Sequence, residues 1–116
     1  MFKSEKEMLN EEKHALRGGN GDPAFHHLFS AAELGNRAEL FASVTLRPGE
    51  SIGVHAHVQN AEAYVVLRGT PRVTENGLEK RLAPGDAEFC ADGNTHSIEN
   101  DTAEPVEFLA LILPNR

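Results

Sequence analysis

Two histidines and a glutamate lie close together in an otherwise apolar and small-residue stretch, GESIGVHAHVQNAEAYVVLRG, at residues 49–69. His55 and His57 are two residues apart, so in a β-strand their side chains point to the same face of the sheet. The next four residues, VQNA, can form a hairpin loop that sets His57 opposite Glu62 on the returning strand. Because directly opposed residues also share a face, we expect two imidazoles and one carboxylate to lie close together.

This group of side chains suits a transition-metal ion. A buried carboxylate is unfavourable by several kcal/mol unless it is paired or binds a metal. Two neutral imidazole nitrogens and one oxygen form a borderline ligand set for Mn, Fe, Co, Ni, Cu or Zn. The alternative is that these residues are exposed at the mouth of a hairpin and bind nothing, and an H-x-H pair alone does not distinguish the two interpretations.

The segments that must position these residues are short and punctuated by glycine and proline. Residues 38–46 alternate between two faces, which is typical of a half-buried strand, and the Asn76-Gly77 pair predicts a tight hairpin within residues 71–82. Further strands are expected at 24–30, 63–69, 87–91, 96–100 and 106–113. Many short strands at regular spacing predict a sandwich or barrel.

Composition and charge restrict the class of protein. The chain has 116 residues, which fits one domain, and its 18 acidic and 11 basic residues give a net charge of −7. The basic residues form no cluster, which argues against nucleic acid or an anionic membrane as a partner. Cys90 is the only cysteine, and the sequence shows neither a signal-peptide core nor an apolar run of about 20 residues. We therefore expect a cytoplasmic protein.

A second stretch, GDAEFCADGNTHSIEN at residues 85–100, contains His96. Together the two stretches resemble the two sequence motifs of the cupin family, over roughly residues 38–113. The first motif, G-x5-H-x-H-x(3,4)-E-x6-G, is matched by Gly49, His55, His57, Glu62 and Gly69. The second, G-x5-P-x-G-x2-H-x3-N, is matched by Gly85, Gly93, His96 and Asn100, with Ala91 where the family usually has proline. The short segment between the motifs is similar to that of small, single-domain bacterial cupins.

The resemblance implies an all-β fold, the cupin double-stranded β-helix or jelly-roll barrel, with an N-terminal extension. On this basis residues 1–23 form an arm and residues 24–116 a single barrel domain. The resemblance also implies one divalent transition metal, Mn, Fe, Ni, Co, Cu or Zn. The implied ligands are His55, His57, Glu62 and His96. Without this proline the loop before His96 is less rigid and the unfolded chain has more freedom, an effect on stability of less than about 1 kcal/mol. Position 91 is not one of the implied ligands.

Two classes of function follow from the resemblance. In the first, the chain is a metal-dependent enzyme for a small oxygenated or carboxylated substrate, in which the metal polarises an oxygen or activates dioxygen. Because no second acid or base is clearly placed inside, dioxygenase-like chemistry is favoured over isomerase- or epimerase-like chemistry. In the second, the barrel is a non-catalytic module that binds or senses a metal or small ligand. Small cupins commonly pair through such arms, so we also expect a homodimer.

Several other residues have open or structural interpretations. Tyr64 shares the ligand-facing side of its strand and either lines a pocket or belongs to the core. Cys90 is expected to be a small buried hydrophobe. His26 and His27 are adjacent, so they face opposite ways in a strand and cannot both bind one ion. His14, in a charged segment that can be helical or extended, is expected to be solvated.

Overall fold

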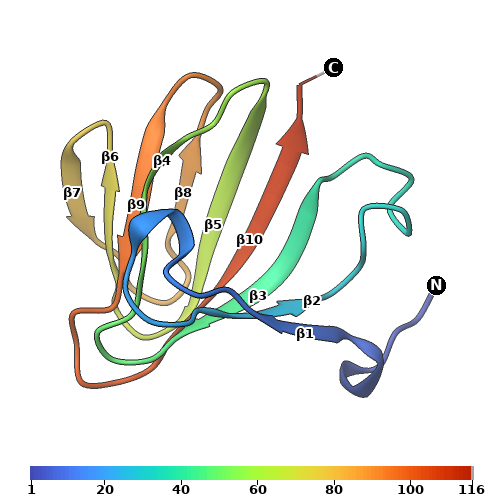
Figure 1. The fold of residues 1–116 in the computed structure, drawn as a ribbon, viewed down its shortest axis with the longest axis horizontal. Helices are drawn as coiled ribbons and strands as arrows, with labels where there is room; N and C mark the ends of the chain where they lie inside the picture. The colour runs from blue at the N-terminus through green and yellow to red at the C-terminus, as the bar shows by residue number, and fades with distance from the viewer. Residues whose placement is uncertain (116) are drawn as a thin grey trace.

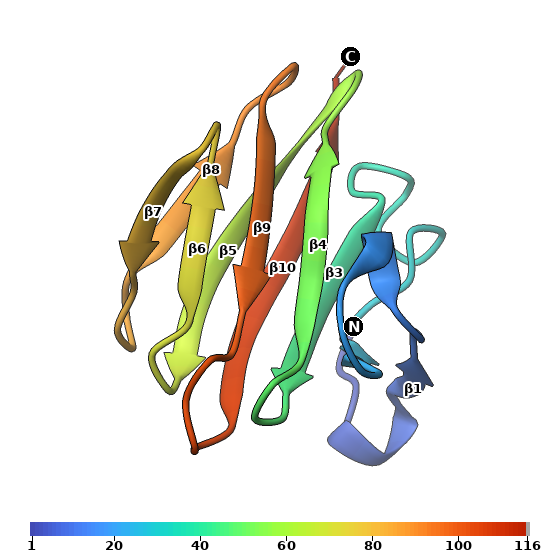
Figure 2. The ribbon, with the colours of Figure 1, turned by 60° about the vertical axis from the view of Figure 1, so that its left-hand side comes forward.

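Two antiparallel sheets face each other in the computed structural model, which describes residues 1–115 (Figures 1 and 2). The six-stranded sheet has the spatial order β1 (Leu9–Glu12), β2 (Ala24–His27), β3 (Leu40–Leu46), β10 (Val106–Pro114), β5 (Asn60–Arg68) and β8 (Ala87–Cys90). The four-stranded sheet has the order β4 (Ser51–Ala56), β9 (Thr95–Glu99), β6 (Arg72–Glu75) and β7 (Leu78–Arg81). Two short 3-10 turns, η1 (Glu5–Glu7) and η2 (Leu16–Gly18), lie in the N-terminal segment. The predicted all-β jelly-roll fold is confirmed.

Alternating side chains fill the space between the sheets. On β3 the buried residues are Ala42, Val44 and Leu46, which is the face that the period of two predicted. On the neighbouring β10, Phe108 and Ala110 are buried against them. Burying a large apolar side chain contributes about 1.5–3 kcal/mol, so this layer is a main source of stability and a dry lining for the interior.

The predicted hairpin is present between β6 and β7. Asn76 and Gly77 have φ angles of 49° and 81°, the left-handed values that a tight type I′ turn requires at both central positions. The turn sets Glu75 opposite Leu78 and Arg72 opposite Arg81. This hairpin forms one edge of the four-stranded sheet.

The N-terminal segment has a short strand, β1, between the two 3-10 turns and no α-helix among its described residues. Strand β1 pairs with β2 and lengthens the six-stranded sheet at its edge. His26 Nδ1 contacts the side-chain oxygen of Asn10, and His27 Nε2 lies 3.0 Å from Glu11 Oε1. These two histidines therefore join the arm to the sheet. The imidazole of His14 is exposed, as expected.

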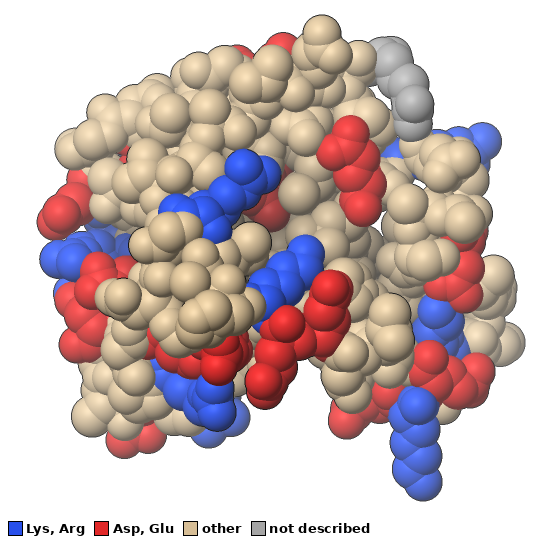
Figure 3. All heavy atoms as spheres, viewed as in Figure 1, with Lys and Arg blue, Asp and Glu red and all other residues tan. Residues whose placement is uncertain are grey.

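Charged side chains of both signs are interspersed on the face of the molecule shown in Figure 3. Several arginines are paired with carboxylates, among them Arg47 with Glu50, Arg72 with Glu99 and Arg81 with Asp101. No helix within residues 1–115 has the length and apolar character needed to cross a membrane.

Candidate metal centre

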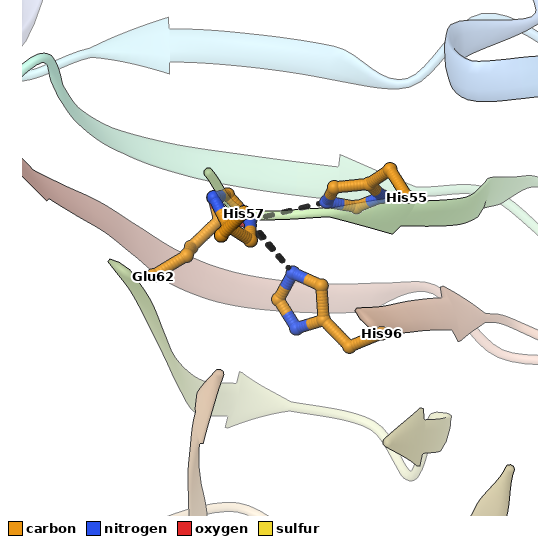
Figure 4. Close-up of side chains that lie close together, drawn as sticks. All are labelled: His55, His57, Glu62 and His96. Carbon is orange, nitrogen blue, oxygen red and sulfur yellow. Dashed lines mark hydrogen bonds and ion pairs between the residues drawn. The ribbon is translucent and has the colours of Figure 1, made fainter. Parts of the chain in front are cut away.

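Four side chains converge in the interior: His55 from β4, His57 from the turn after it, Glu62 from β5 and His96 from β9 (Figure 4). Glu62 Oε1 lies 2.9 Å from His57 Nε2, 3.0 Å from His96 Nε2 and 3.6 Å from His55 Nε2. His57 Nε2 and His96 Nε2 are 3.1 Å apart. The side chains of all four are at most 6% exposed. The structure thus brings together every residue of the predicted ligand set, which we call the histidine–glutamate cluster.

The prediction of how His57 meets Glu62 was wrong. Strands β4 and β5 lie in different sheets, since β4 pairs with β9 whereas β5 pairs with β10 and β8. The segment between them is therefore a crossover from one sheet to the other, with Gln59 in the left-handed region at φ 62°. The two side chains face each other across the interior instead of lying side by side in one sheet. The cross-strand neighbour of His55 is His96.

The imidazoles of His55 and His57 are each oriented through their other ring nitrogen. His55 Nδ1 donates to the backbone oxygen of Gly53 at 2.8 Å, and His57 Nδ1 donates to Asn60 Oδ1 at 2.8 Å. The Asn60 amide is itself fixed, because its Nδ2 donates to Glu39 Oε2 at 2.9 Å. An oxygen acceptor at Nδ1 places the ring hydrogen there, so each neutral imidazole presents an Nε2 lone pair to the cluster.

Glu88 orients the third imidazole. Its Oε1 and Oε2 lie 2.9 Å and 3.1 Å from His96 Nδ1, and the Glu88 side chain is 10% exposed. Sequence reasoning missed both Glu88 and Asn60, because neither occupies a position fixed by the two motifs. Only the pairing of β5 with β8, which sets Tyr64 opposite Glu88, brings Glu88 behind His96.

The atoms that meet at the centre are all acceptors. In the neutral rings, with each ring hydrogen on Nδ1, three Nε2 lone pairs and one carboxylate oxygen point toward one another with no N–H between these four atoms. Such a group requires a cation, either a proton or a metal ion. Ligand atoms bonded at about 2.1 Å and at right angles lie about 3 Å apart, which matches the three shortest separations in the cluster. The residues therefore fit a divalent transition metal, as their chemistry predicted.

Protonation of the metal-free cluster also reflects the need of these acceptor atoms for a cation. Burial alone would raise the pKa of Glu62, but the imidazoles of His55, His96 and His57 around its carboxylate outweigh it and lower the pKa to about 2. Burial alone would lower the pKa of His96, but hydrogen bonds with Glu62 and Glu88 raise it to about 9. At neutral pH the metal-free cluster thus holds a carboxylate and a protonated His96, and a metal ion would take the place of that proton.

Tyr64 belongs both to the core and to the cavity wall. Its ring is fully buried, stacks on His96 with centroids 4.6 Å apart and contacts the edge of Phe108 at 4.8 Å. Burial raises the pKa of Tyr64 well above its usual value, so the phenol stays neutral. The ring holds one face of His96 in place.

Cys90 is a fully buried free thiol. Burial, with the nearby charge of Glu88, raises its pKa to about 12, so it keeps its proton at neutral pH. Cys90, Glu88 and His96 are close enough to form a second possible ligand group. A metal ion bound there through His96 Nδ1 would have to displace the contact that this nitrogen makes with Glu88.

A cavity of about 100 Å³ adjoins the cluster. Its apolar lining comes from Phe25, Leu40, Ile52 and Ile112. Its remaining wall comes from the N-terminal segment, at Lys13, Leu16 and Arg17. A larger hollow of about 620 Å³ lies on the outer face of the six-stranded sheet and does not contact the cluster. The small interior cavity is therefore where a ligand would meet the metal.

Comparison with known proteins gives relatives along nearly the whole chain. An oxalate-binding protein of Thermotoga maritima is 38% identical over 107 residues, which cover 92% of this chain and 88% of that protein. A crystal structure from Thermotoga maritima, described as a predicted oxalate decarboxylase, superposes with a TM-score of 0.93 at 37% identity and covers 98% of this chain and 99% of that one. A mannose-1-phosphate guanylyltransferase of Salmonella typhimurium is 33% identical over 81 residues, which are 70% of this chain but only 17% of the enzyme.

The family model of the cupin domain matches residues 42–112. That range contains all four residues of the histidine–glutamate cluster, and it includes most of β3 and most of β10. With the two sheets, the interior cluster and the relatives in agreement, the chain belongs to the cupin family.

Proposed function

We propose that this protein binds one divalent transition metal through His55, His57, Glu62 and His96, and that the metal binds a small carboxylate ligand of the kind of oxalate. The observation that carries the proposal is the convergence of four acceptor atoms, without a donor, beside an interior cavity. The carboxylate is supported by the oxalate-binding relative, whose similarity extends along most of both chains.

The chain's own residues would hold, orient and shield such a ligand. Four protein ligands leave an octahedral ion two positions for substrate. When bound, the metal supplies Lewis-acid or, for a redox-active ion, electron-transfer chemistry. The apolar wall of Phe25, Leu40, Ile52 and Ile112 limits water and strengthens electrostatic interactions between ligand and metal. The small cavity favours a small ligand.

The proposal has two versions: the protein either converts the bound ligand chemically or only binds it. Among the cavity-lining residues, Glu62 is the only carboxylate and belongs to the ligand set, while Tyr64 stays neutral. This scarcity of a free acid–base pair favours oxygen-dependent, dioxygenase-like chemistry at the metal over isomerisation. The alternative is a binding or sensor module without turnover, which the description of the Thermotoga relative as oxalate-binding supports.

Metal-dependent ligand binding tests the function. Protein purified without chelators or metal-affinity steps should contain one metal ion per chain. Apo-protein reloaded separately with Mn(II), Fe(II) and Zn(II) should then bind oxalate, as measured by calorimetry, whereas the metal-free protein should not. Equal oxalate affinity with and without metal would contradict the proposal.

Turnover separates the two versions. Oxygen uptake and loss of oxalate should be followed for each metal form, with other small acids and enols as further substrates. Turnover with Fe(II) or Mn(II) but not Zn(II) supports oxygen-dependent catalysis. Equal turnover with Zn(II) leaves only Lewis-acid chemistry, and saturable binding without turnover supports the binding module.

We further propose that the protein is a cytoplasmic homodimer. The outer hollow of the six-stranded sheet is lined by apolar side chains such as Met8, Leu67 and Leu109 and also by four glutamates, and β1 leaves an open sheet edge. Light scattering at micromolar concentration should give twice the mass of one 12.6 kDa chain, and a monomer mass would contradict the dimer. The buried free thiol of Cys90 accords with a reducing compartment.

A further inference from the structure

One wall of the interior cavity comes from the N-terminal arm and not from the barrel motifs. Lys13, Leu16 and Arg17 line the same cavity as His55, His57 and Glu62. Figures 1 and 2 show this blue segment, around η2, against β4. Two positively charged residues, the half-buried Lys13 and the exposed Arg17, therefore line the same small cavity as the candidate metal ligands.

These two cations are not neutralised by the protein. Within residues 1–115 no ion pair or side-chain hydrogen bond involves Arg17 or the ammonium of Lys13, although the chain as a whole carries a net charge of −7. The Nζ atom of Lys13 lies 4.5 Å from the centroid of the Phe25 ring, a cation–π contact that holds the ammonium at the apolar wall. The cavity thus has positive charge available to bind an anionic ligand in addition to Glu62.

The backbone that carries Arg17 is held in an unfavourable conformation. Ala15 and Arg17 have φ angles of 47° and 55°, in the left-handed region that side chains other than glycine seldom adopt. The turn is pressed onto β4: a Cβ atom on Gly53 would lie 2.1 Å from the backbone oxygen of Arg17. A Cβ atom on Gly19 would lie 2.3 Å from the backbone oxygen of Ser51. Strained conformations that the surrounding packing enforces are concentrated at ligand clamps and active sites.

We infer that Lys13 and Arg17 form a recognition site for the second carboxylate of a dianionic ligand whose first carboxylate binds the metal. The inference rests on the proposed function and adds the ligand class and the residues that select it. A guanidinium and an ammonium bind carboxylates through charge-assisted hydrogen bonds. The cavity of about 100 Å³ places both cations and the candidate metal ligands around one small space, so we expect the ligand to be a short dicarboxylate.

Calorimetry on the full-length Mn(II)-loaded protein, at saturating metal and with oxalate or acetate as the ligand, tests the inference. The variants are Arg17→Gln, Lys13→Met, the double variant and Arg17→Lys. Arg68→Gln is the control for each single variant, because it also removes one positive charge, at the far end of β5, where no ion pair within residues 1–115 involves it. Metal affinity is measured separately by chelator competition.

The double variant should bind oxalate about 10- to 100-fold more weakly than wild type, because charge-assisted hydrogen bonds contribute that much. Acetate binding should weaken much less than oxalate binding, because acetate has no second carboxylate, and Mn(II) affinity should not fall, because the variant removes nearby positive charge. Arg17→Lys should recover part of the oxalate affinity, and its fold is verified by circular dichroism.

Wild-type oxalate affinity in the double variant overturns the inference and leaves the proposed function standing. An equal loss for oxalate and acetate overturns the requirement for two carboxylates. Wild-type Mn(II)-protein that binds no oxalate overturns the proposed function, and the inference with it.

Discussion

The molecule has two pairs of histidines, one on β2 of the six-stranded sheet and one at the end of β4 in the four-stranded sheet. Only the pair at β4 belongs to the histidine–glutamate cluster. On β2, His26 and His27 are adjacent, so their rings point to opposite faces and each meets an acceptor on the arm. On β4 and the turn after it, His55 and His57 are two residues apart, and their Nε2 atoms both approach Glu62.

The difference shows that spacing and partners, more than the number of histidines, decide whether a group can bind a metal. In the cluster, an oxygen atom holds each Nδ1 and leaves Nε2 free to face other acceptors. On β2, His27 uses Nε2 for Glu11, whereas His26 Nε2 is buried with no hydrogen-bond partner among the described residues. The first group demands a cation, and the second already ties the arm to the sheet.

Removing one imidazole ring from each group should give the largest difference in metal occupancy between the two groups. His57→Ala or His96→Ala should reduce metal occupancy from one ion per chain to near zero, because each deletes a proposed ligand. His27→Ala removes a histidine outside the cluster and should leave occupancy unchanged. Elemental analysis after dialysis measures both. Wild-type occupancy in either cluster variant would contradict the proposed ligand set.

Removing the carboxylate behind His96 should have a smaller effect. Glu88→Ala should weaken metal affinity about 10- to 100-fold, because it frees Nδ1 of the imidazole without deleting a ligand. Glu88→Gln retains an oxygen acceptor and should recover part of that loss. Glu79→Ala, on the exposed strand β7, is the control. Competition with a chromogenic chelator gives the affinities, and a Glu88→Ala affinity equal to that of Glu79→Ala would show that Glu88 does not position His96.

The pH dependence of stability should also separate metal-free from metal-loaded protein. His96 has a folded-state pKa of about 9 against 6.5 when unfolded, so its stabilising effect is complete below pH 6.5 and lost as the pH rises to about 9. Glu62 has a pKa of about 2 against 4.5, so its effect is present above pH 4.5 and lost as the pH falls toward 2. Metal-free protein should therefore lose stability between pH 6.5 and 9.

Urea unfolding at several pH values, with EDTA or with saturating Mn(II), measures this trend. The metal-loaded protein should not show the alkaline decline, because the metal replaces the proton on His96. His27→Ala serves as the control and should retain the decline in EDTA. A metal-free wild type whose midpoint stays constant from pH 6.5 to 9 would contradict the protonation described for the cluster.

The smallest effect is expected at the arm. His27→Ala removes a partly exposed contact with Glu11 and the stacking of the ring on Phe25, and it should lower the free energy of unfolding by about 1 kcal/mol. Hydrogen exchange should become faster in β1, with little change in β4 and β9. Equal acceleration in all three strands would show that the arm is not a separate, weaker element.

The strands and the convergence of His55, His57, Glu62 and His96 could be predicted because their signals are local. Alternation over residues 40–46 and the Asn76-Gly77 pair depend only on neighbouring residues, and the two motifs place the histidines. The loop before His96 keeps its shape without the usual proline, because Asn94 N donates to Ala91 O at 3.0 Å and Gly93 N donates to His57 O at 2.7 Å.

The remainder depends on pairings between distant segments. The connection between β4 and β5 has a length that suits a hairpin, and only the pairing of β4 with β9 makes it a crossover. Glu88 reaches His96 through the pairing of β5 with β8. Arg17 reaches the cavity because Gly53 leaves room for its backbone. No local pattern in the sequence contains these relationships.

The central claim is that the four converging acceptor atoms hold a metal ion. A crystal structure of Mn(II)-loaded protein, with anomalous diffraction data for manganese, tests it most directly. The account predicts one strong peak inside the barrel, within about 2.3 Å of His57 Nε2, His96 Nε2 and Glu62 Oε1, with His55 Nε2 completing the set. A manganese peak only at other residues, or no peak in crystals of protein that binds Mn(II) in solution, would contradict it.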